Sequence, residues 1–164
     1  MMGCGKTSLG KKLARQLDYD FIDIDEFIEK KEGKTISELF DIWGEEEFRI
    51  QEHLYLKKIG QSENGVISTG GGLACYHNNM SLMNQLGETL FLYADSAFLS
   101  SRLKQGKASR PLIAALTDEE LPSFVDALLE KRNPFYEQAK HIVPSKDLKV
   151  SDVLELFKSK GLSF

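Results

Sequence analysis

A short segment at the start of the sequence combines the residue types that bind phosphate. It reads Gly3-Cys4-Gly5-Lys6-Thr7-Ser8 and matches the second half of the phosphate-binding motif G-x-x-x-x-G-K-[ST]. In that motif, glycines let backbone N–H groups converge on one phosphate, and the following helix adds its unpaired N–H groups. Lys6 would contact the outer phosphates of a nucleotide, and Thr7 would offer its hydroxyl to Mg²⁺. The motif's first glycine would precede Met1, so a flexible segment without this function is the alternative.

Two aspartates lie at the carboxyl end of a predicted short strand over residues 19–24. Asp23 and Asp25 are two residues apart, so their carboxylates share one face if the strand continues through both. In an open α/β sheet, ligands bind at the carboxyl ends of the strands. Alternatively, Asp25 caps a helix over residues 26–31, although that leaves Asp23 without a role.

Three consecutive glycines follow a second predicted strand over residues 65–68. Gly70, Gly71 and Gly72 cost backbone entropy, which is reasonable where the backbone must pass close to a ligand. The alternative is a tight turn between a strand and a helix, for which one glycine would suffice.

Arginines complete the set of residues that could bind an anion. Arg49 lies in an acidic first turn of a predicted helix over residues 45–58, where a solvated pair with Glu45 or Glu52 is the simplest interpretation. Residues 104–112 are basic and contain Gly and Pro, which predicts a mobile loop or an ordinary solvated one. Arg132 lies in a long helical pattern over residues 117–139.

The composition fits one globular domain. Of 164 residues, 41% are hydrophobic and 28% are charged, and the net charge is −4. An acidic balance argues against a general nucleic-acid binder, and no apolar run approaches the about 20 residues of a membrane span. Cys4 and Cys75 are far apart and in no metal-binding spacing, so we expect reduced thiols in the cytoplasm.

The predicted elements alternate between helix and strand, which indicates a parallel sheet covered by helices on both faces. Besides the segments above, the pattern predicts helices over residues 7–17, 35–42, 96–103 and 150–160, and strands over residues 88–94 and 141–143.

Together these residues resemble the shikimate kinase family over essentially the whole chain. The resemblance implies an α/β fold, namely the three-layer P-loop kinase fold of nucleoside-monophosphate kinases, with a parallel sheet ordered 2-3-1-4-5. It implies a single domain over residues 1–164, with substrate-binding helices over about 25–60 and a lid over about 103–113. The first strand, the middle of that order, is missing from this chain. Either the native chain begins upstream of Met1 or this form folds poorly.

The resemblance also implies an activity. The family transfers the γ-phosphate of ATP to the 3-hydroxyl of shikimate, in aromatic amino-acid biosynthesis. We therefore expect ATP and shikimate as substrates, one Mg²⁺ ion, no nucleic-acid or membrane partner, and a cytoplasmic monomer. Two alternatives are another small-molecule kinase of this fold, such as a gluconate kinase, and an inactive phosphate-binding domain.

The catalytic and metal-binding roles follow from the resemblance position by position. Lys6 would contact the transferred phosphate, and Asp25 would bond the attacking hydroxyl and act as its base. Arg110 would contact the γ-phosphate when the lid closes. Thr7 would bind Mg²⁺ directly, and Asp23 would hold the ion through water.

The substrate-binding roles are assigned in the same way. Arg49 and Arg132 would bind the shikimate carboxylate, because planar guanidinium groups match carboxylates with paired hydrogen bonds. Phe48 would form an apolar wall, and the backbone N–H groups of Gly70–Gly72 would hold the substrate. Nucleotide contacts would come from Gly3, Cys4, Gly5, Lys6, Thr7, Ser8, Arg102 and Arg110, with Arg102 against the adenine.

Overall fold

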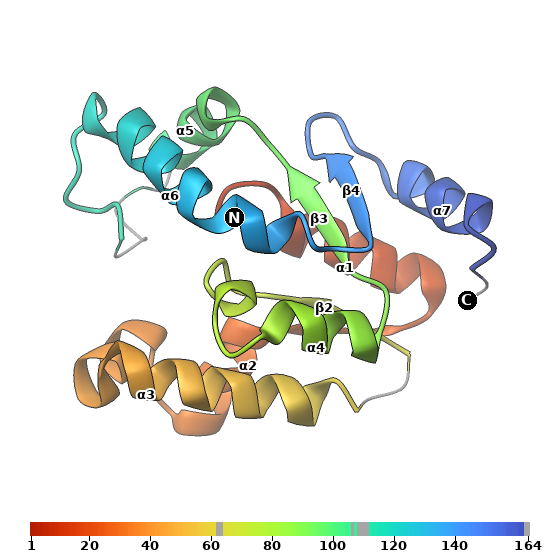
Figure 1. Ribbon diagram of the computed structural model, residues 1–164, viewed down its shortest axis with the longest axis horizontal. Helices are drawn as coiled ribbons and strands as arrows, with labels where there is room; N and C mark the ends of the chain where they lie inside the picture. The colour runs from red at the N-terminus through yellow and green to blue at the C-terminus, as the bar shows by residue number, and fades with distance from the viewer. Residues whose placement is uncertain (62–63, 106, 108–111, 163–164) are drawn as a thin grey trace.

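A computed structural model of the chain describes residues 1–61, 64–105, 107 and 112–162, and its helices and strands alternate along the chain (Figure 1). The strands are β1 (Asp20–Asp23), β2 (Gly65–Ser68), β3 (Leu90–Tyr93) and β4 (His141–Pro144). The helices are α1 (Lys6–Leu17), α2 (Ile24–Glu32), α3 (Ile36–Ile59), α4 (Asn79–Leu86), α5 (Ser96–Lys104), α6 (Glu120–Tyr136) and α7 (Val150–Ser159), with a short 3₁₀ helix, η1 (Leu73–Cys75). No helix in these ranges is both long and apolar enough to span a bilayer.

The strands form two parallel pairs. β1 pairs with β2, with Asp20 opposite Gly65, and β3 pairs with β4, with Leu90 opposite His141. Among the described residues, no backbone ladder joins β2 to β3, so the structure contains two sheets of two strands each. In the order 2-3-1-4-5, these pairs correspond to strands 2-3 and 4-5 on either side of position 1.

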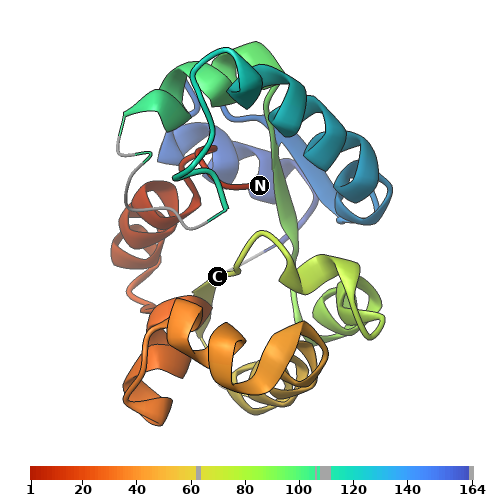
Figure 2. The ribbon, with the colours of Figure 1, turned by 90° about the vertical axis from the view of Figure 1, so that its left-hand side faces the viewer.

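Helices cover the strands on both sides, and apolar clusters fill the space between them. Figure 2 shows α2 and α3 gathered at one end of the molecule and α5 and α6 at the other. Ile24, Ile28 and Phe48 belong to the cluster beneath α2 and α3, whereas Leu99 and Leu121 belong to the cluster between α5 and α6. The cleft described below lies where these two halves meet the start of α1.

The boundary between β1 and α2 differs from the prediction. α2 begins at Ile24, so Asp25 lies in its first turn and is not extended. Asp23 is the N-cap residue, and its carboxylate accepts a hydrogen bond from the Asp25 N–H at 3.2 Å. The expectation that both carboxylates share a strand face is therefore wrong, and the cap is Asp23 rather than Asp25. Satisfying a free N–H at the helix start favours this earlier boundary.

The two helices predicted over residues 35–42 and 45–58 are joined at a bend within α3. Thr35 and Glu38 form the reciprocal capping box expected at its start,. Gly44 has φ 74° and ψ 172°, which interrupts the helical conformation in a region of backbone space that glycine enters readily. After this bend, Phe48 and Arg49 are buried, so the bend positions two residues to which the resemblance assigns substrate contacts.

η1 and α4 lie in a stretch for which the sequence analysis gave no range. The remaining differences are at element ends. The strand predicted over residues 88–94 is limited to Leu90–Tyr93, and the helix predicted over residues 117–139 spans Glu120–Tyr136. Pro134 lies inside α6, near its carboxyl end.

Candidate active site

The phosphate-binding segment forms a tight backbone loop that leads directly into α1. Gly3 and Gly5 have φ values of 78° and 93°, in the left-handed region that glycine adopts without a steric penalty. Gly5 is the N-cap of α1, and no side chain caps this helix start. A helix start of this kind presents free N–H groups and a positive dipole end, which suits an anion.

Lys6 and Cys4 both contact the backbone of Met1. The Lys6 ammonium donates to the Met1 carbonyl oxygen at 2.6 Å, and the Cys4 thiol donates to the same oxygen at 3.0 Å. Burial acts to raise the pKa of the Cys4 thiol, but the charges of Lys6 and the Met1 amino group, together with hydrogen bonds to Lys6, outweigh it and lower that pKa. The Cys4 side chain is buried and faces an apolar slot rather than the cleft, so its contribution to a nucleotide would come from its backbone.

Thr7 and the two aspartates are joined by hydrogen bonds. The Thr7 hydroxyl donates to Asp23 Oδ2 at 3.0 Å, and Asp23 Oδ1 accepts from the Asp25 N–H. Burial and then the Asp23 charge raise the pKa of Asp25, while Lys6 and Arg49 oppose the shift. Both cations therefore act on Asp25, although they come from different elements.

Each of the three consecutive glycines lies against a different charged side chain. A Cβ on Gly70 would lie 2.7 Å from Asp25 Oδ1, and a Cβ on Gly71 would lie 3.1 Å from Arg132 Nη1. A Cβ on Gly72 would lie 2.6 Å from Arg49 Nη2. A side chain at Gly70 or Gly72 would therefore displace an ionic group, and one at Gly71 would press against Arg132. A simple turn would not require this close approach.

Arg49 is buried and held from several directions. Only 9% of the residue is exposed, and its guanidinium donates to Glu52 at 2.7 Å and lies 3.6 Å from Glu45. Burial acts to lower the pKa of Arg49, but the charge and hydrogen bond of Glu52, with smaller contributions from Tyr76 and Glu45, together outweigh it and raise that pKa. The guanidinium also lies over the rings of Tyr76, Phe40 and Phe48 at 4.6, 5.3 and 5.3 Å. The ion pairs with Glu45 and Glu52 that the sequence suggested are present. The expectation that Arg49 is solvated is wrong, because α3 turns this side chain inward.

The cleft itself has a volume of about 720 Å³. The residues that line it come from the phosphate-binding loop, the start of α2, the glycine segment and α5. They include Gly3, Gly5, Lys6, Thr7, Ser8, Asp23, Asp25, residues 68–71 and Arg102. Arg102 projects from α5 with its guanidinium carbon 5.5 Å above the Phe98 ring. Arg110, with its predicted contact, and residues 106, 108, 109 and 111 of the predicted lid lie outside the described residues.

Three further residues support this site without having been assigned a role from the sequence. Glu52 is 2% exposed and orients Arg49, as its spacing of three residues along the helix could have suggested. The Tyr136 hydroxyl donates to the Gly71 carbonyl oxygen, and burial raises the Tyr136 pKa to about 12. Tyr76 donates to Glu45 at 2.8 Å while its ring lies against Arg49. No sequence pattern distinguishes Tyr76 from other tyrosines.

Comparison with known proteins identifies the family. The family model described as "Shikimate kinase" matches residues 2–159. A shikimate kinase of Phocaeicola vulgatus is 46% identical over 147 residues, which cover 90% of this chain and 84% of the relative.

Solved structures show the same similarity. A shikimate kinase from Bacteroides thetaiotaomicron superimposes with a TM-score of 0.91 at 43% identity, covering 98% of this chain and 94% of the other. A shikimate kinase from Acinetobacter baumannii, solved in complex with shikimate, gives a TM-score of 0.87 at 32% identity, covering 99% of this chain and 91% of the other. The chain therefore has the P-loop kinase fold and belongs to the shikimate kinase family.

Proposed function

We propose that this chain transfers the γ-phosphoryl group of ATP to the 3-hydroxyl of shikimate, giving shikimate 3-phosphate. One observation carries this proposal. The glycine segment brings Asp25, Arg132 and Arg49 into contact with consecutive residues, directly beside the phosphate loop. Shikimate carries one carboxylate and several hydroxyls. A site that binds it therefore needs guanidinium groups at one end and a hydrogen-bond acceptor at the other.

Arg49 and Arg132 would bind the carboxylate of shikimate. Paired N–H donors from a planar guanidinium match the two carboxylate oxygens in geometry as well as charge. Glu52 and the surrounding aromatic rings hold the Arg49 fork in place. Little side-chain freedom would then be lost on binding, and the acceptor would be oriented for reaction.

Asp25 would orient the attacking hydroxyl and take its proton. Phosphoryl transfer depends mainly on alignment and on neutralising charge. A base is needed only late, when the hydroxyl has begun to bond to phosphorus and has become acidic. The raised pKa of Asp25 makes it a better proton acceptor than an ordinary aspartate. Lys6, at the start of α1, would neutralise charge on the transferred phosphate.

Thr7 and Asp23 would hold Mg²⁺ together with the phosphates. The hydroxyl and carboxylate are 3.0 Å apart and supply the oxygen ligands that Mg²⁺ prefers,. The described residues contain no group of three His, Cys, Asp or Glu that could hold a metal, which fits an ion whose other ligands are phosphate oxygens and water. When bound, the ion neutralises charge on the β- and γ-phosphates.

The nucleotide would lie along the loop from Gly3 to Ser8, with the exposed Arg102 against the adenine. The role of Arg110 at the γ-phosphate and the closing lid over residues 103–113 stay predictions from the resemblance. We also infer a cytoplasmic monomer, in keeping with a small metabolic enzyme.

A coupled ADP-release assay tests this function. We expect turnover with ATP, Mg²⁺ and shikimate, and at least about a hundredfold lower kcat/KM with gluconate, because a mismatched acceptor leaves buried polar groups unpaired. Excess chelator should abolish turnover. Faster turnover with gluconate would instead support the other small-molecule kinase, and ATP binding without turnover on either acceptor would support an inactive phosphate-binding domain.

A further inference from the structure

A buried asparagine connects α3 to the end of the glycine segment. The Asn79 amide nitrogen donates to the Leu73 carbonyl oxygen at 2.8 Å, and Asn79 Oδ1 lies 2.5 Å from His53 Nδ1. His53 belongs to α3, Asn79 is the first residue of α4, and Leu73 begins η1 directly after Gly72. We call His53, Asn79 and Leu73 the Asn79 bridge.

The chemistry of the groups fixes which of them donate in the Asn79 bridge. A backbone carbonyl oxygen only accepts, so the amide nitrogen of Asn79 must face Leu73, and Oδ1 must face His53. Because Oδ1 also only accepts, His53 Nδ1 must carry a proton, which leaves the lone pair of the neutral ring on Nε2. Asn79 is 0% exposed. Removing one partner would therefore leave a buried polar group without a hydrogen bond.

The Asn79 bridge completes a closed ring of contacts around Arg49. His53 lies one turn after Arg49 on the same face of α3,. The Arg49 guanidinium lies against Gly72, where an added Cβ would be 2.6 Å from Nη2. Leu73 follows Gly72, and its carbonyl connects back to α3 through Asn79. The ring thus fixes the spacing between α3 and the glycine segment at the point where Arg49 fills it.

We propose that His53 and Asn79 are positioning residues that set the affinity for shikimate by fixing the place of the Arg49 guanidinium. This inference rests on the proposed function, because that function assigns Arg49 to the shikimate carboxylate. Neither residue of the pair lines the cleft. They act through Arg49, because a displacement of about 1 Å in a binding site is costly.

Titration with shikimate provides the first test. His53→Leu removes the donor to Asn79 but keeps an apolar side chain. His53→Asn restores a donor, because the amide nitrogen of asparagine occupies the place of histidine Nδ1. We expect His53→Leu to raise the Kd for shikimate about tenfold while the Kd for ATP stays within about twofold. His53→Asn should remain within about threefold of the wild type, and Asn79→Ala should match His53→Leu.

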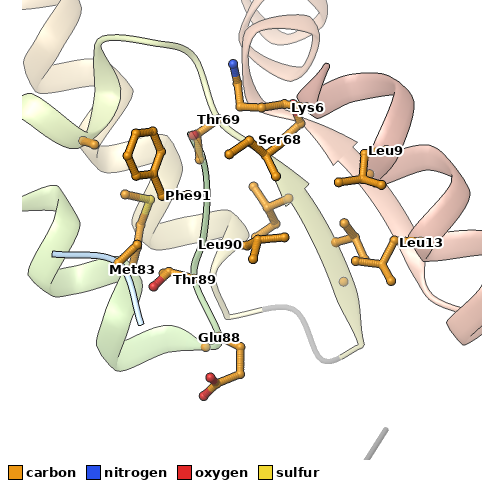
Figure 3. Close-up of a pocket in the computed structure, with 18 of the residues that line it drawn as sticks. Lys6, Leu9, Leu13, Ser68, Thr69, Met83, Glu88, Thr89, Leu90 and Phe91 are labelled. Carbon is orange, nitrogen blue, oxygen red and sulfur yellow. The ribbon is translucent and has the colours of Figure 1, made fainter. Parts of the chain in front are cut away.

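His141→Leu is the matched control, since it also removes a buried, hydrogen-bonded histidine. His141 is 7% exposed, and its Nε2 lies 2.7 Å from Glu88 Oε2. Figure 3 shows Glu88 far from Ser68 and Thr69, which lead into the glycine segment. We expect this variant to lower the Tm and to leave the Kd for shikimate unchanged. If it raises that Kd as much as His53→Leu does, lost stability weakens binding and the proposal is overturned.

The tautomer of His53 provides a second test that needs no substrate. Nitrogen chemical shifts of the imidazole distinguish a proton on Nδ1 from one on Nε2. At about pH 9, where histidine side chains are neutral, we expect the Nδ1–H form in the wild type. Asn79→Ala should shift His53 towards the Nε2–H form that free histidine favours. If Asn79→Ala does not fold, the wild-type tautomer and the His53 variants still decide.

The outcomes separate this inference from the proposed function. A wild-type protein that does not bind shikimate would contradict the proposed function and would overturn this inference with it. If the wild type binds shikimate, an unchanged Kd in His53→Leu would overturn the inference alone. An equal rise in His53→Asn, or an Nε2–H form of His53 in the wild type, would do the same.

Discussion

Arg102 lines the cleft and Arg49 lies against Gly72 of the glycine segment, and the surroundings of these two arginines differ. Arg49 is 9% exposed and is fixed by Glu52, Glu45 and three aromatic rings. Arg102 is exposed and lies over the single ring of Phe98. We call the region of Asp25, Arg49 and Gly70–Gly72 the acceptor side, and the region of Gly3–Ser8 and α5 the phosphate side.

This difference indicates how the two substrates would be handled. The contacts of Arg49 hold the acceptor side in place without a ligand. Under the proposed function, specificity for the acceptor would therefore be built into the fold. On the phosphate side, Lys6 bonds the Met1 carbonyl and would have to exchange that bond for a phosphate. The predictions below test whether the acceptor side is as fixed as its contacts imply.

Replacing Asp25 should have the largest effect. Asp25→Asn keeps the shape but removes the base, so kcat should fall about a thousandfold while ATP binding is retained. Asp41→Asn, at an exposed position of α3, is the matched control. A kcat within threefold of the wild type would remove Asp25 from the reaction.

Asp25→Asn should stabilise the folded protein at neutral pH, even though it lowers kcat. Because the folded-state pKa of Asp25 is raised, its contribution to stability is fully present below the unfolded pKa of about 4. That contribution is lost as pH rises through the folded value. Asp25→Asn should therefore raise the Tm at pH 7 and lose this advantage as the pH approaches 4. A lower Tm of Asp25→Asn at pH 7 would show that the ionised Asp25 carboxylate does not destabilise the folded protein.

Arg49→Lys should have the next largest effect. A lysine keeps the charge but loses the planar fork and its bond geometry with Glu52. We expect the KM for shikimate to rise about 10- to 100-fold, with the KM for ATP nearly unchanged. Arg15→Lys, at an exposed position of α1, provides the comparison. If both KM values rise together, Arg49 supports the fold as a whole rather than the acceptor side.

Gly72→Ala tests the glycine segment without replacing a charged residue. The new methyl group would lie 2.6 Å from Arg49 Nη2 and must displace the guanidinium. We expect about a tenfold rise in the KM for shikimate, since small displacements in a binding site are costly. Gly87→Ala is the control, because a Cβ there meets nothing within 4 Å. Similar kinetics for both variants would mean that Arg49 moves freely.

Tyr76→Phe should have the smallest effect. It removes the hydrogen bond to Glu45 but keeps the ring beneath Arg49. The KM for shikimate should rise less than about threefold, and Tyr76→Ala should raise it further because the ring is lost. Tyr93→Phe, on a half-exposed tyrosine, serves as the control. If Tyr76→Phe and Tyr76→Ala raise the KM for shikimate equally, the hydroxyl rather than the ring of Tyr76 positions Arg49.

The sequence predicted the helix and strand order because the apolar periodicity and glycine breaks are strong in this chain. It misplaced the start of α2, because Asp23 and Asp25 are both good capping residues and only the geometry distinguishes them,. It favoured a solvated Arg49, because charge spacing along a helix does not reveal which face is buried.

The identity of the site residues came from the family resemblance, and their surroundings came from the structure. The close approach of charged side chains to Gly70, Gly71 and Gly72 became clear only from the structure. Tyr76 could not have been found in advance, because its partners Glu45 and Arg49 lie about 30 residues away in the chain. Such contacts depend on how α3 packs against η1.

Amide chemical shifts under separate titration with each substrate test the central claim most directly. We predict that shikimate alone, without nucleotide, shifts the amide signals of Gly70, Gly71 and Gly72. ATP with Mg²⁺ should shift those of Gly3–Ser8. If shikimate leaves the three glycine amides unchanged, or shifts only the phosphate-loop amides, the account of a preformed acceptor side is contradicted.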